Sequence, residues 1–176
     1  MKKRNAFILA VSIPLLILLA MTVKPLATVI FGQEILLETR AVYPGDSFRG
    51  DCLSLEYKIS TVPKDMLPHS VKNYGDEPVR NLTLYVSLKP EGKFYVIDSI
   101  SDKKPDSGLY LKGVVRYYDY ENMPDTVFID YTLDKYFVKQ GSGIELQEQS
   151  RLGDLIARAK VLDGYAILTG VQAGSN

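Results

Sequence analysis

The sequence predicts a mainly β protein in which one N-terminal transmembrane helix is followed by a small antiparallel β domain. The first observation is a long apolar run behind a basic N-terminus, which is typical of a helix that enters a membrane. The second is an alternation of apolar and polar residues in the rest of the chain, the pattern of strands with one face on a core. The residues after the apolar run suffice for one domain with its own core and are too few for two packed domains.

Charge and length predict the helix. Positions 2–4 are basic, and residues 6–23 contain no charged side chain. At 1.5 Å per residue, about 18 helical residues nearly match a hydrocarbon core of about 30 Å, and residues 26–31 would lengthen the helix. Because basic residues favour the cytoplasmic side, we expect a single-pass protein of the cytoplasmic (inner) membrane. Its expected parts are a cytoplasmic basic N-terminus at 1–5, a transmembrane signal-anchor region at 6–31 and an extracytoplasmic β-rich domain at 32–176.

A cleaved signal peptide is the alternative for this segment. Signal peptides have the same basic start and apolar centre, but they carry small residues at positions −3 and −1 of the cleavage site. A cut after Ala20 would place Leu18 at −3, and a cut after Ala27 would place Pro25 there. Neither is a convincing cleavage site, so we favour a retained anchor.

The clearest strand begins at residue 51, and its alternation places Cys52 on the polar face. Its apolar face consists of Leu53, Leu55, Tyr57 and Ile59. Further strands are expected at 109–118 and 126–133, with 136–138 continuing the second. Irregular structure is expected at 62–78, 101–107, 119–125 and 140–153, where proline, glycine or clustered charge occurs.

Two hairpins are predicted with their register. The first joins 82–89 to 93–100 through a three-residue loop, 90–92, whose glycine suits a positive φ. Asp163-Gly164, the dipeptide that a type I′ turn prefers, predicts the second. The expected pairs are Leu88 with Phe94 and Val86 with Val96 in the first hairpin, and Val161 with Ala166, Ala159 with Leu168 and Ala157 with Gly170 in the second. In the first, Leu84 opposite Asp98 is a mismatch that predicts a bulge or a frayed ladder.

Composition argues against several classes of function. Lys+Arg and Asp+Glu both number 21, so no net charge attracts nucleic acid. With one cysteine, Cys52, and one histidine, His69, the chain can form neither an intramolecular disulfide nor a zinc tetrad. We therefore expect no metal and no cofactor; the alternative is calcium binding by carboxylates alone, for which the sequence has no loop of EF-hand spacing.

The octapeptide Gly50-Asp51-Cys52-Leu53-Ser54-Leu55-Glu56-Tyr57 resembles the signature of the GDYXXLXY family, a group of small bacterial membrane-anchored proteins of unknown function. The family motif is matched at Gly50, Asp51, Leu55 and Tyr57, whereas Cys52 stands where the family has tyrosine. The likeness runs from about the anchor to the end of the chain and includes the closing Asp163-Gly164 hairpin. Because family members are often encoded beside, or fused to, multi-spanning membrane proteins of unknown role, the resemblance implies an integral membrane partner. It supplies no catalytic residue.

A weaker likeness concerns the β domain of serine–lysine signal peptidases. In that family a Ser-Met-x-Pro segment precedes a Gly-Asp that opens a strand, and here Ala41-Val42-Tyr43-Pro44 precedes Gly50-Asp51. Ala41 falls where the nucleophile would be, and alanine has no oxygen to attack a carbonyl. The likeness therefore implies a signal-peptidase-like fold without that chemistry.

The candidate polar site consists of Pro44, Asp46, Arg49, Gly50 and Asp51. The charged members would form a site between two strands, but the same residues suit a structured turn, in which the carboxylates accept hydrogen bonds from nearby amides. We favour the turn. Ser47, Cys52 and His69 are weaker candidates without a partner of suitable spacing, and residues 117–121 form an aromatic and acidic cluster that more simply ends a strand.

These observations favour a membrane-anchored accessory or interaction protein over an enzyme, and we assign no catalytic residue. One alternative is a membrane-tethered hydrolase or peptidase on a signal-peptidase-like scaffold, which requires a serine beside a lysine. The other is a cell-wall or solute binding module, which requires a concave aromatic pocket near residues 117–120.

Overall fold

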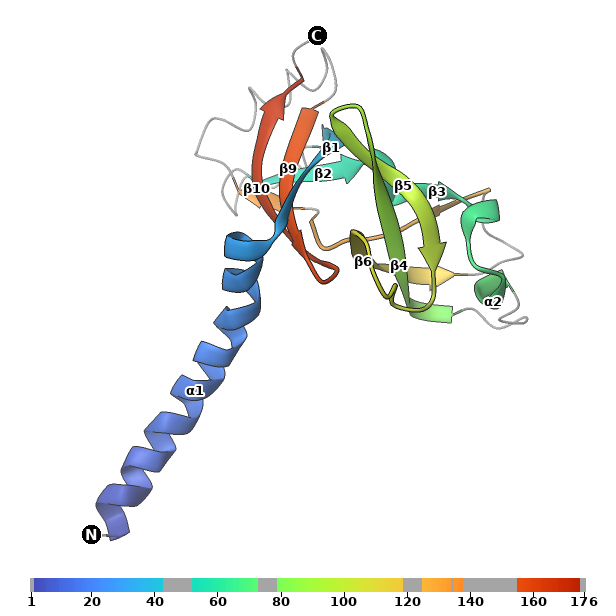
Figure 1. The fold of residues 1–176 in the computed structure, drawn as a ribbon. Coiled ribbons are helices and arrows are strands. Elements are labelled where there is room, and N and C mark those ends of the chain that lie inside the picture. The colour runs from blue at the N-terminus through green and yellow to red at the C-terminus, as the bar shows by residue number, and fades with distance from the viewer. Residues whose placement is uncertain are drawn as a thin grey trace.

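In the computed structural model of the chain, a long helix leads into a domain of antiparallel strands, as the sequence predicts (Figure 1). The structure describes residues 2–42, 52–72, 79–118, 125–133, 135–137 and 155–174. The helices are α1 (Lys2–Phe31) and α2 (His69–Lys72), with 3₁₀ turns η1 (Lys58–Ser60) and η2 (Lys64–Met66). The strands are β1 (Gln33–Val42), β2 (Cys52–Tyr57), β3 (Thr61–Pro63), β4 (Val79–Glu91), β5 (Phe94–Ser101), β6 (Tyr110–Tyr118), β7 (Thr126–Phe128), β8 (Lys135–Phe137), β9 (Leu155–Leu162) and β10 (Tyr165–Ala173).

Helix α1 is a single element of 30 residues that continues through Pro14 and Pro25. Its segment Leu9–Phe31 is long and apolar enough to cross a membrane. The large apolar side chains of this segment are exposed, Leu19 at 66% and Phe31 at 75%, for example. A core helix of a water-soluble domain would bury such side chains, so α1 needs apolar surroundings of another kind.

The described residues form three sheets, and every pair of neighbouring strands in them is antiparallel. The largest has the order β10-β9-β1-β2-β8, a second has the order β5-β4-β6, and β3 pairs with β7. One hydrophobic core lies between the sheets, built from alternate residues such as Ile35 and Leu37 of β1 and Leu84 and Val86 of β4. The predicted alternation of β2 is confirmed where side chains are described, since Leu55 and Tyr57 are buried and Glu56 is exposed.

The β9–β10 hairpin confirms its predicted turn. Asp163 and Gly164 both have positive φ, 50° and 75°, as a type I′ turn requires. The pairs Val161–Ala166 and Ala159–Leu168 form as expected. The third predicted pair is wrong, because a bulge between Leu168 and Gly170 sets Gly170 opposite Arg158 and Val171 opposite Ala157.

The predicted register of the β4–β5 hairpin is wrong. The turn is a two-residue one, Gly92-Lys93, so Pro90 and Glu91 remain in β4. Leu88 consequently pairs with Ile97 rather than Phe94, and Val86 pairs with Ile100 rather than Val96. The expected irregularity does occur at Asp98, since Leu88 pairs with Ile97 while Ser87 pairs with Ser99, which leaves Asp98 as the extra residue.

Other predictions are confirmed or corrected strand by strand. The strand at 109–118 forms as β6, while the one at 126–133 ends at Phe128. Thr132 has a φ of +59° and its N–H donates to the Asp130 carboxylate, which turns the chain. Tyr136 and Phe137 do not continue this strand, because they belong to β8, which pairs with β2; residue 138 lies outside the described residues. The region 62–78 was expected to be irregular, but its described part, 62–72, contains the end of β3 together with η2 and α2.

The junction between α1 and β1 contains a single residue, Gly32. The Gly32 N–H donates to the carbonyl oxygen of Thr28 at 2.9 Å, which closes the last helical turn. A Cβ at this position would lie 2.3 Å from the same oxygen. The chain therefore passes from helix to strand without a flexible linker, at a position that suits glycine.

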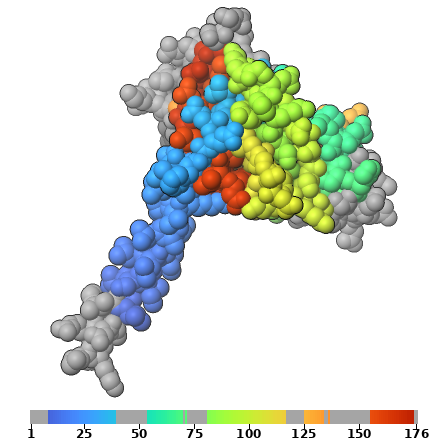
Figure 2. Space-filling view, viewed as in Figure 1, coloured from blue at the N-terminus to red at the C-terminus, as the bar shows by residue number. Residues whose placement is uncertain are grey.

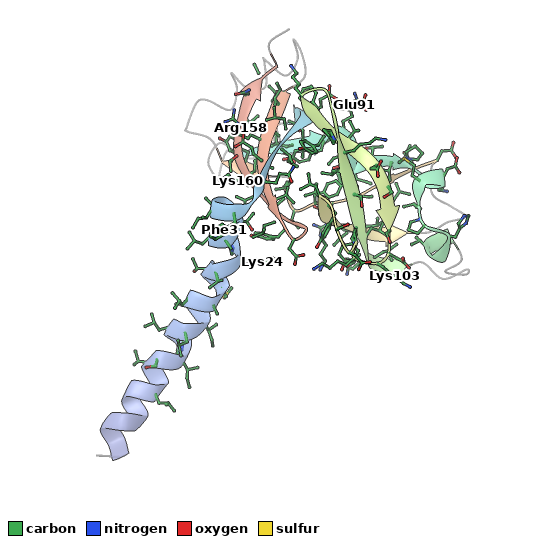
Figure 3. The ribbon with its side chains drawn as sticks, in the orientation of Figure 1. Lys24, Phe31, Glu91, Lys103, Arg158 and Lys160 are labelled. Carbon is green, nitrogen blue, oxygen red and sulfur yellow. The ribbon has the colours of Figure 1, made fainter. Side chains whose placement is uncertain are left out.

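Two contacts hold the end of α1 against the β9–β10 hairpin. The Lys160 ammonium donates to the Val29 carbonyl oxygen at 2.5 Å, and Lys24 lies over the Tyr165 ring at 4.9 Å. Figure 3 shows Lys160 beside the last turns of the helix, near Phe31. Together with the one-residue junction, these contacts fix the direction of α1 relative to the domain.

The tip of the same hairpin is fastened to the other sheet. The Asp163 carboxylate accepts hydrogen bonds from the Tyr110 hydroxyl at 2.5 Å and from the Lys104 ammonium at 2.6 Å. Lys104, and then Tyr110, hold the pKa of Asp163 below its usual value, and Asp163 raises the pKa of Lys104. The Lys112 N–H donates to the Gly164 carbonyl at 2.9 Å. Helix, hairpin and both larger sheets thus form one connected body.

Candidate functional site

The candidate site predicted from the sequence lies outside the described residues. Pro44, Asp46, Arg49, Gly50 and Asp51 belong to the segment that joins β1 to β2. These two strands are antiparallel neighbours, and their pairing reaches Val42 opposite Ser54. The choice between a polar site and a structured turn therefore stays a prediction.

The two described residues of the family motif have structural positions. Leu55 and Tyr57 point into the core with exposed fractions of 3% and 5%. The Tyr57 hydroxyl donates to the Leu133 carbonyl oxygen at 2.7 Å. Because a buried carbonyl needs a hydrogen-bond donor, Tyr57 joins β2 to the segment 129–133.

Residues 58–60, which follow the motif, are held by the same segment. The Tyr131 hydroxyl donates to the Ile59 carbonyl at 2.9 Å, and the Ile129 N–H donates to the Ser60 carbonyl at 2.7 Å. Burial raises the pKa of Tyr131, so its hydroxyl keeps its proton and remains a donor. The motif strand and these hydrogen bonds therefore fix the position of η1.

A groove of about 230 Å³ opens beside η1. It is lined by Glu38 of β1, by residues of η1, β3 and η2, and by residues 95–97 of β5. Figure 2 shows the teal segment that contains β3 lying beside the yellow-green strand β5 on one face of the molecule. We call this the β3–β5 groove, and it is the candidate functional site of the described residues.

The β3–β5 groove is mostly apolar and has one ion pair at its border. The Lys58 ammonium lies 2.9 Å from a Glu38 carboxylate oxygen. Val62 is fully buried at the base, whereas Met66 keeps 39% of its surface exposed. Such a lining favours an uncharged ligand with an apolar side chain.

The groove lacks the elements of hydrolytic chemistry among its lining residues. Its side-chain hydroxyls are those of Thr61 and of Tyr95, which accepts a hydrogen bond from the Gln33 amide at 3.0 Å, and its amine is Lys58, which is held by Glu38. A nucleophilic hydroxyl needs a neighbouring base that accepts its proton, and an ammonium in an ion pair is a poor acceptor. The geometry suits binding.

The remaining candidates from the sequence do not lie in this groove. His69 is exposed at the start of α2, and Ala41 pairs with Leu55 in the large sheet. For Cys52 and Tyr117 the structure gives the strand positions and not the side chains, and Ser47 lies outside the described residues. Within the described residues no group of three His, Cys, Asp or Glu side chains is arranged to hold a metal ion.

Sequence reasoning missed the groove because its walls are distant in the chain. One signal was present, since Pro63 interrupts a strand-like run and proline is confined to strand edges, first positions or bulges. That signal marks an edge without saying what lies opposite.

Comparison with known proteins gives one match. The model of a family described as GDYXXLXY protein matches residues 14–171, from within α1 to within β10. No curated protein and no solved structure matches the chain.

Proposed function

Because the chain belongs to the GDYXXLXY protein family, whose description specifies a motif and no activity, we propose a function from its structure: it is a membrane-anchored extracytoplasmic accessory protein that works through contact with an integral membrane partner. Helix α1 anchors it in the cytoplasmic membrane with the N-terminus inside. The basic residues at positions 2–4 support this orientation.

The observation that carries the proposal is the rigid junction. An enzyme that acts on diffusing substrates gains little from a fixed angle between anchor and domain, and a flexible linker would serve it equally well. Here Gly32 alone separates α1 from β1, and Lys160 and Lys24 bind the helix to the hairpin. A fixed angle presents one face of the domain at a constant height and direction, which suits docking to a neighbour in the same membrane.

The test compares two insertions in the full-length protein. A short glycine-serine insertion after Gly32 frees the domain from the helix, and the same insertion between the exposed residues Asp106 and Ser107 leaves the junction intact. Affinity purification from detergent extracts should recover a specific integral membrane protein with the wild type and with the Asp106 insertion. The insertion after Gly32 should lose it.

Two results would contradict the proposal. The first is an affinity purification in which the wild type recovers no protein beyond those that the affinity tag alone recovers. The second concerns the compartment: a cysteine introduced as Asp106→Cys, with Cys52→Ser, should react with a membrane-impermeant maleimide in intact cells. Labelling that occurs only after cell lysis would place the domain in the cytoplasm.

A further inference from the structure

The β3–β5 groove is bordered by strand edges. Residues 95, 96 and 97 of β5 all line it, as do residues 61, 62 and 63 of β3. Alternate residues of a strand point to opposite faces, so three consecutive residues border a groove when the strand presents its edge to it. In the described sheets β5 is the last strand of the order β5-β4-β6, and β3 has one strand partner, β7.

The register shows which backbone groups of β5 face away from β4. In an antiparallel pair, alternate residues exchange both backbone hydrogen bonds with the partner, and the residues between them direct N–H and C=O to the other side. The two-residue turn makes Glu91 and Phe94 a hydrogen-bonded pair, followed by Lys89 and Val96. Tyr95 and Ile97 therefore direct their N–H and C=O away from β4.

The pairing of β4 with β6 independently shows which residues of β4 face β5. The Leu88 N–H donates to the Leu109 carbonyl of the segment that precedes β6, so the even-numbered residues of β4 face β6. The odd-numbered residues, including Lys89 and Glu91, consequently face β5. No backbone hydrogen bond joins Tyr95 or Ile97 to another described segment beyond its own hairpin.

Strand β3 also presents an open edge. The Lys64 N–H donates to the Asp125 carbonyl and the Ile129 N–H donates to the Ser60 carbonyl. Residues 60, 62 and 64 therefore face β7, and Thr61 and Pro63 face away. Proline is tolerated at such a position because it has no N–H to contribute. The outward edge of β3 therefore lacks one hydrogen-bond donor, at Pro63. The outward edge of β5 has both donors and acceptors, at Tyr95 and Ile97.

We propose that the β3–β5 groove binds an extended, uncharged peptide segment of the membrane partner, which adds to the edge of β5 that has no partner strand among the described residues, by hydrogen bonds to Tyr95 and Ile97. This inference rests on the proposed accessory function and names the contact by which it works. An apolar side chain of the segment fills the hollow above Val62.

The chemistry of the groove selects this occupant. Outward N–H and C=O groups two residues apart match the alternate residues of another extended backbone. The opposite charges of Lys58 and Glu38 compensate each other, and the rest of the lining is uncharged and mostly apolar, so an uncharged segment suits the groove better than a charged one. A single added strand lies about 4.8 Å from its neighbour, so an extended segment needs only the space beside β5.

The probe is a phage-displayed library of random octapeptides, selected on the full-length protein in lipid nanodiscs. Selected peptides should carry an apolar residue and no net charge. The two test variants are Ile97→Pro and Ile97→Ala. Both lose the isoleucine side chain, but only the proline removes the outward N–H, which makes no backbone hydrogen bond to the described residues.

Relative to Ile97→Ala, the Ile97→Pro variant should bind the selected peptide about tenfold more weakly, as expected for one lost hydrogen bond with an unpaired acceptor. Residue-resolved hydrogen exchange gives an independent pattern. The bound peptide should slow exchange of the Tyr95 and Ile97 amides, and it should leave Phe94 and Val96, already bonded to β4, nearly unchanged.

Equal affinity of the two variants for the selected peptide would overturn the inference. So would a peptide that slows hydrogen exchange of Phe94 and Val96 but not of Tyr95 and Ile97, and so would a library that yields no binding peptide. If, without peptide, hydrogen exchange of the Tyr95 and Ile97 amides slowed as the protein concentration rose, the occupant of the groove would be a second copy of the chain and the proposed partner segment would be wrong. Recovery of the membrane partner by Ile97→Pro at the wild-type level would refute the groove contact and leave the accessory function standing.

Discussion

Replacement of Tyr57 by phenylalanine measures how firmly the family motif holds the rest of the domain. The substitution keeps the buried ring and removes the hydroxyl that donates to the Leu133 carbonyl at 2.7 Å. Leu133 and Tyr57 are both buried, with exposed fractions of 4% and 5%, so water does not easily replace the lost donor. A buried acceptor left unpaired costs about 1–3 kcal/mol. We expect Tyr57→Phe to lower the free energy of unfolding by about 1.5 kcal/mol.

The assay is thermal unfolding of the full-length protein in detergent, followed by circular dichroism of the strands and by tyrosine fluorescence, since the chain contains no tryptophan. For a domain of this size, about 1.5 kcal/mol lowers the melting temperature by about 3–6 °C. Tyr131→Phe should give a similar decrease, because its hydroxyl donates to the Ile59 carbonyl at 2.9 Å.

Tyr85→Phe is the matched control. Its ring is partly buried against Tyr110, and its hydroxyl makes no hydrogen bond to the described residues. It should change the free energy of unfolding by less than about 0.5 kcal/mol. If Tyr57→Phe were as stable as this control, the hydroxyl would not hold the segment 129–133, and the structural reason for a tyrosine at this motif position would be wrong.

Two further predictions concern other contacts. Gly113→Ala would place a Cβ 2.3 Å from the Ile129 Cγ2 atom, so the free energy of unfolding should fall by about 1–3 kcal/mol in the same assay. Asp163→Asn, which tolerates the positive φ, should be less stable than wild type above the ordinary carboxyl pKa of 3.8. Because Lys104 and Tyr110 lower the folded pKa of Asp163, that difference should disappear as the pH falls through the lowered value, and a difference that persists in acid would refute the assignment.

Local chemistry explains which parts of the fold the sequence predicts correctly. The alternation in β2 fixes the buried positions of Leu55 and Tyr57, since a strand has a period of two residues. Asp163-Gly164 fixes the turn of the last hairpin because both residues accept a positive φ. The apolar run fixes α1, because its side chains are unsuited to water along the whole length.

The register of the β4–β5 hairpin shows the limit of local chemistry. Gly92 supplies a positive φ of 62°, and this suits a two-residue turn as well as the predicted three-residue loop. The pattern of apolar residues does not decide between them, because the bulge at Asp98 reverses the alternation within β5. Contacts on both faces of β4 settle the register, and those contacts come from distant segments.

The groove is less predictable still, because an open edge is a property of the strand order. Nothing in residues 95–97 distinguishes an edge strand from a central one, and the position of β5 depends on β6 pairing with the other side of β4. Pro63 is the exception, since a missing N–H is tolerated at an edge. It indicates an open side of β3 and leaves the facing strand unknown.

The rigid junction and the position of the groove together constrain the partner. Figure 3 shows Glu91, beside the β4–β5 turn, at the end of the domain remote from α1, and Lys103 and Lys24 toward the opposite end. Strand β5 runs between these levels, and six steps from Tyr95 to Ser101 span about 20 Å. If α1 spans the membrane, a segment that pairs with Tyr95 and Ile97 must rise by about that height. The proposed partner would therefore need a loop or domain that extends from the membrane on the side of the β domain, and a protein with only short turns on that side would not reach the groove.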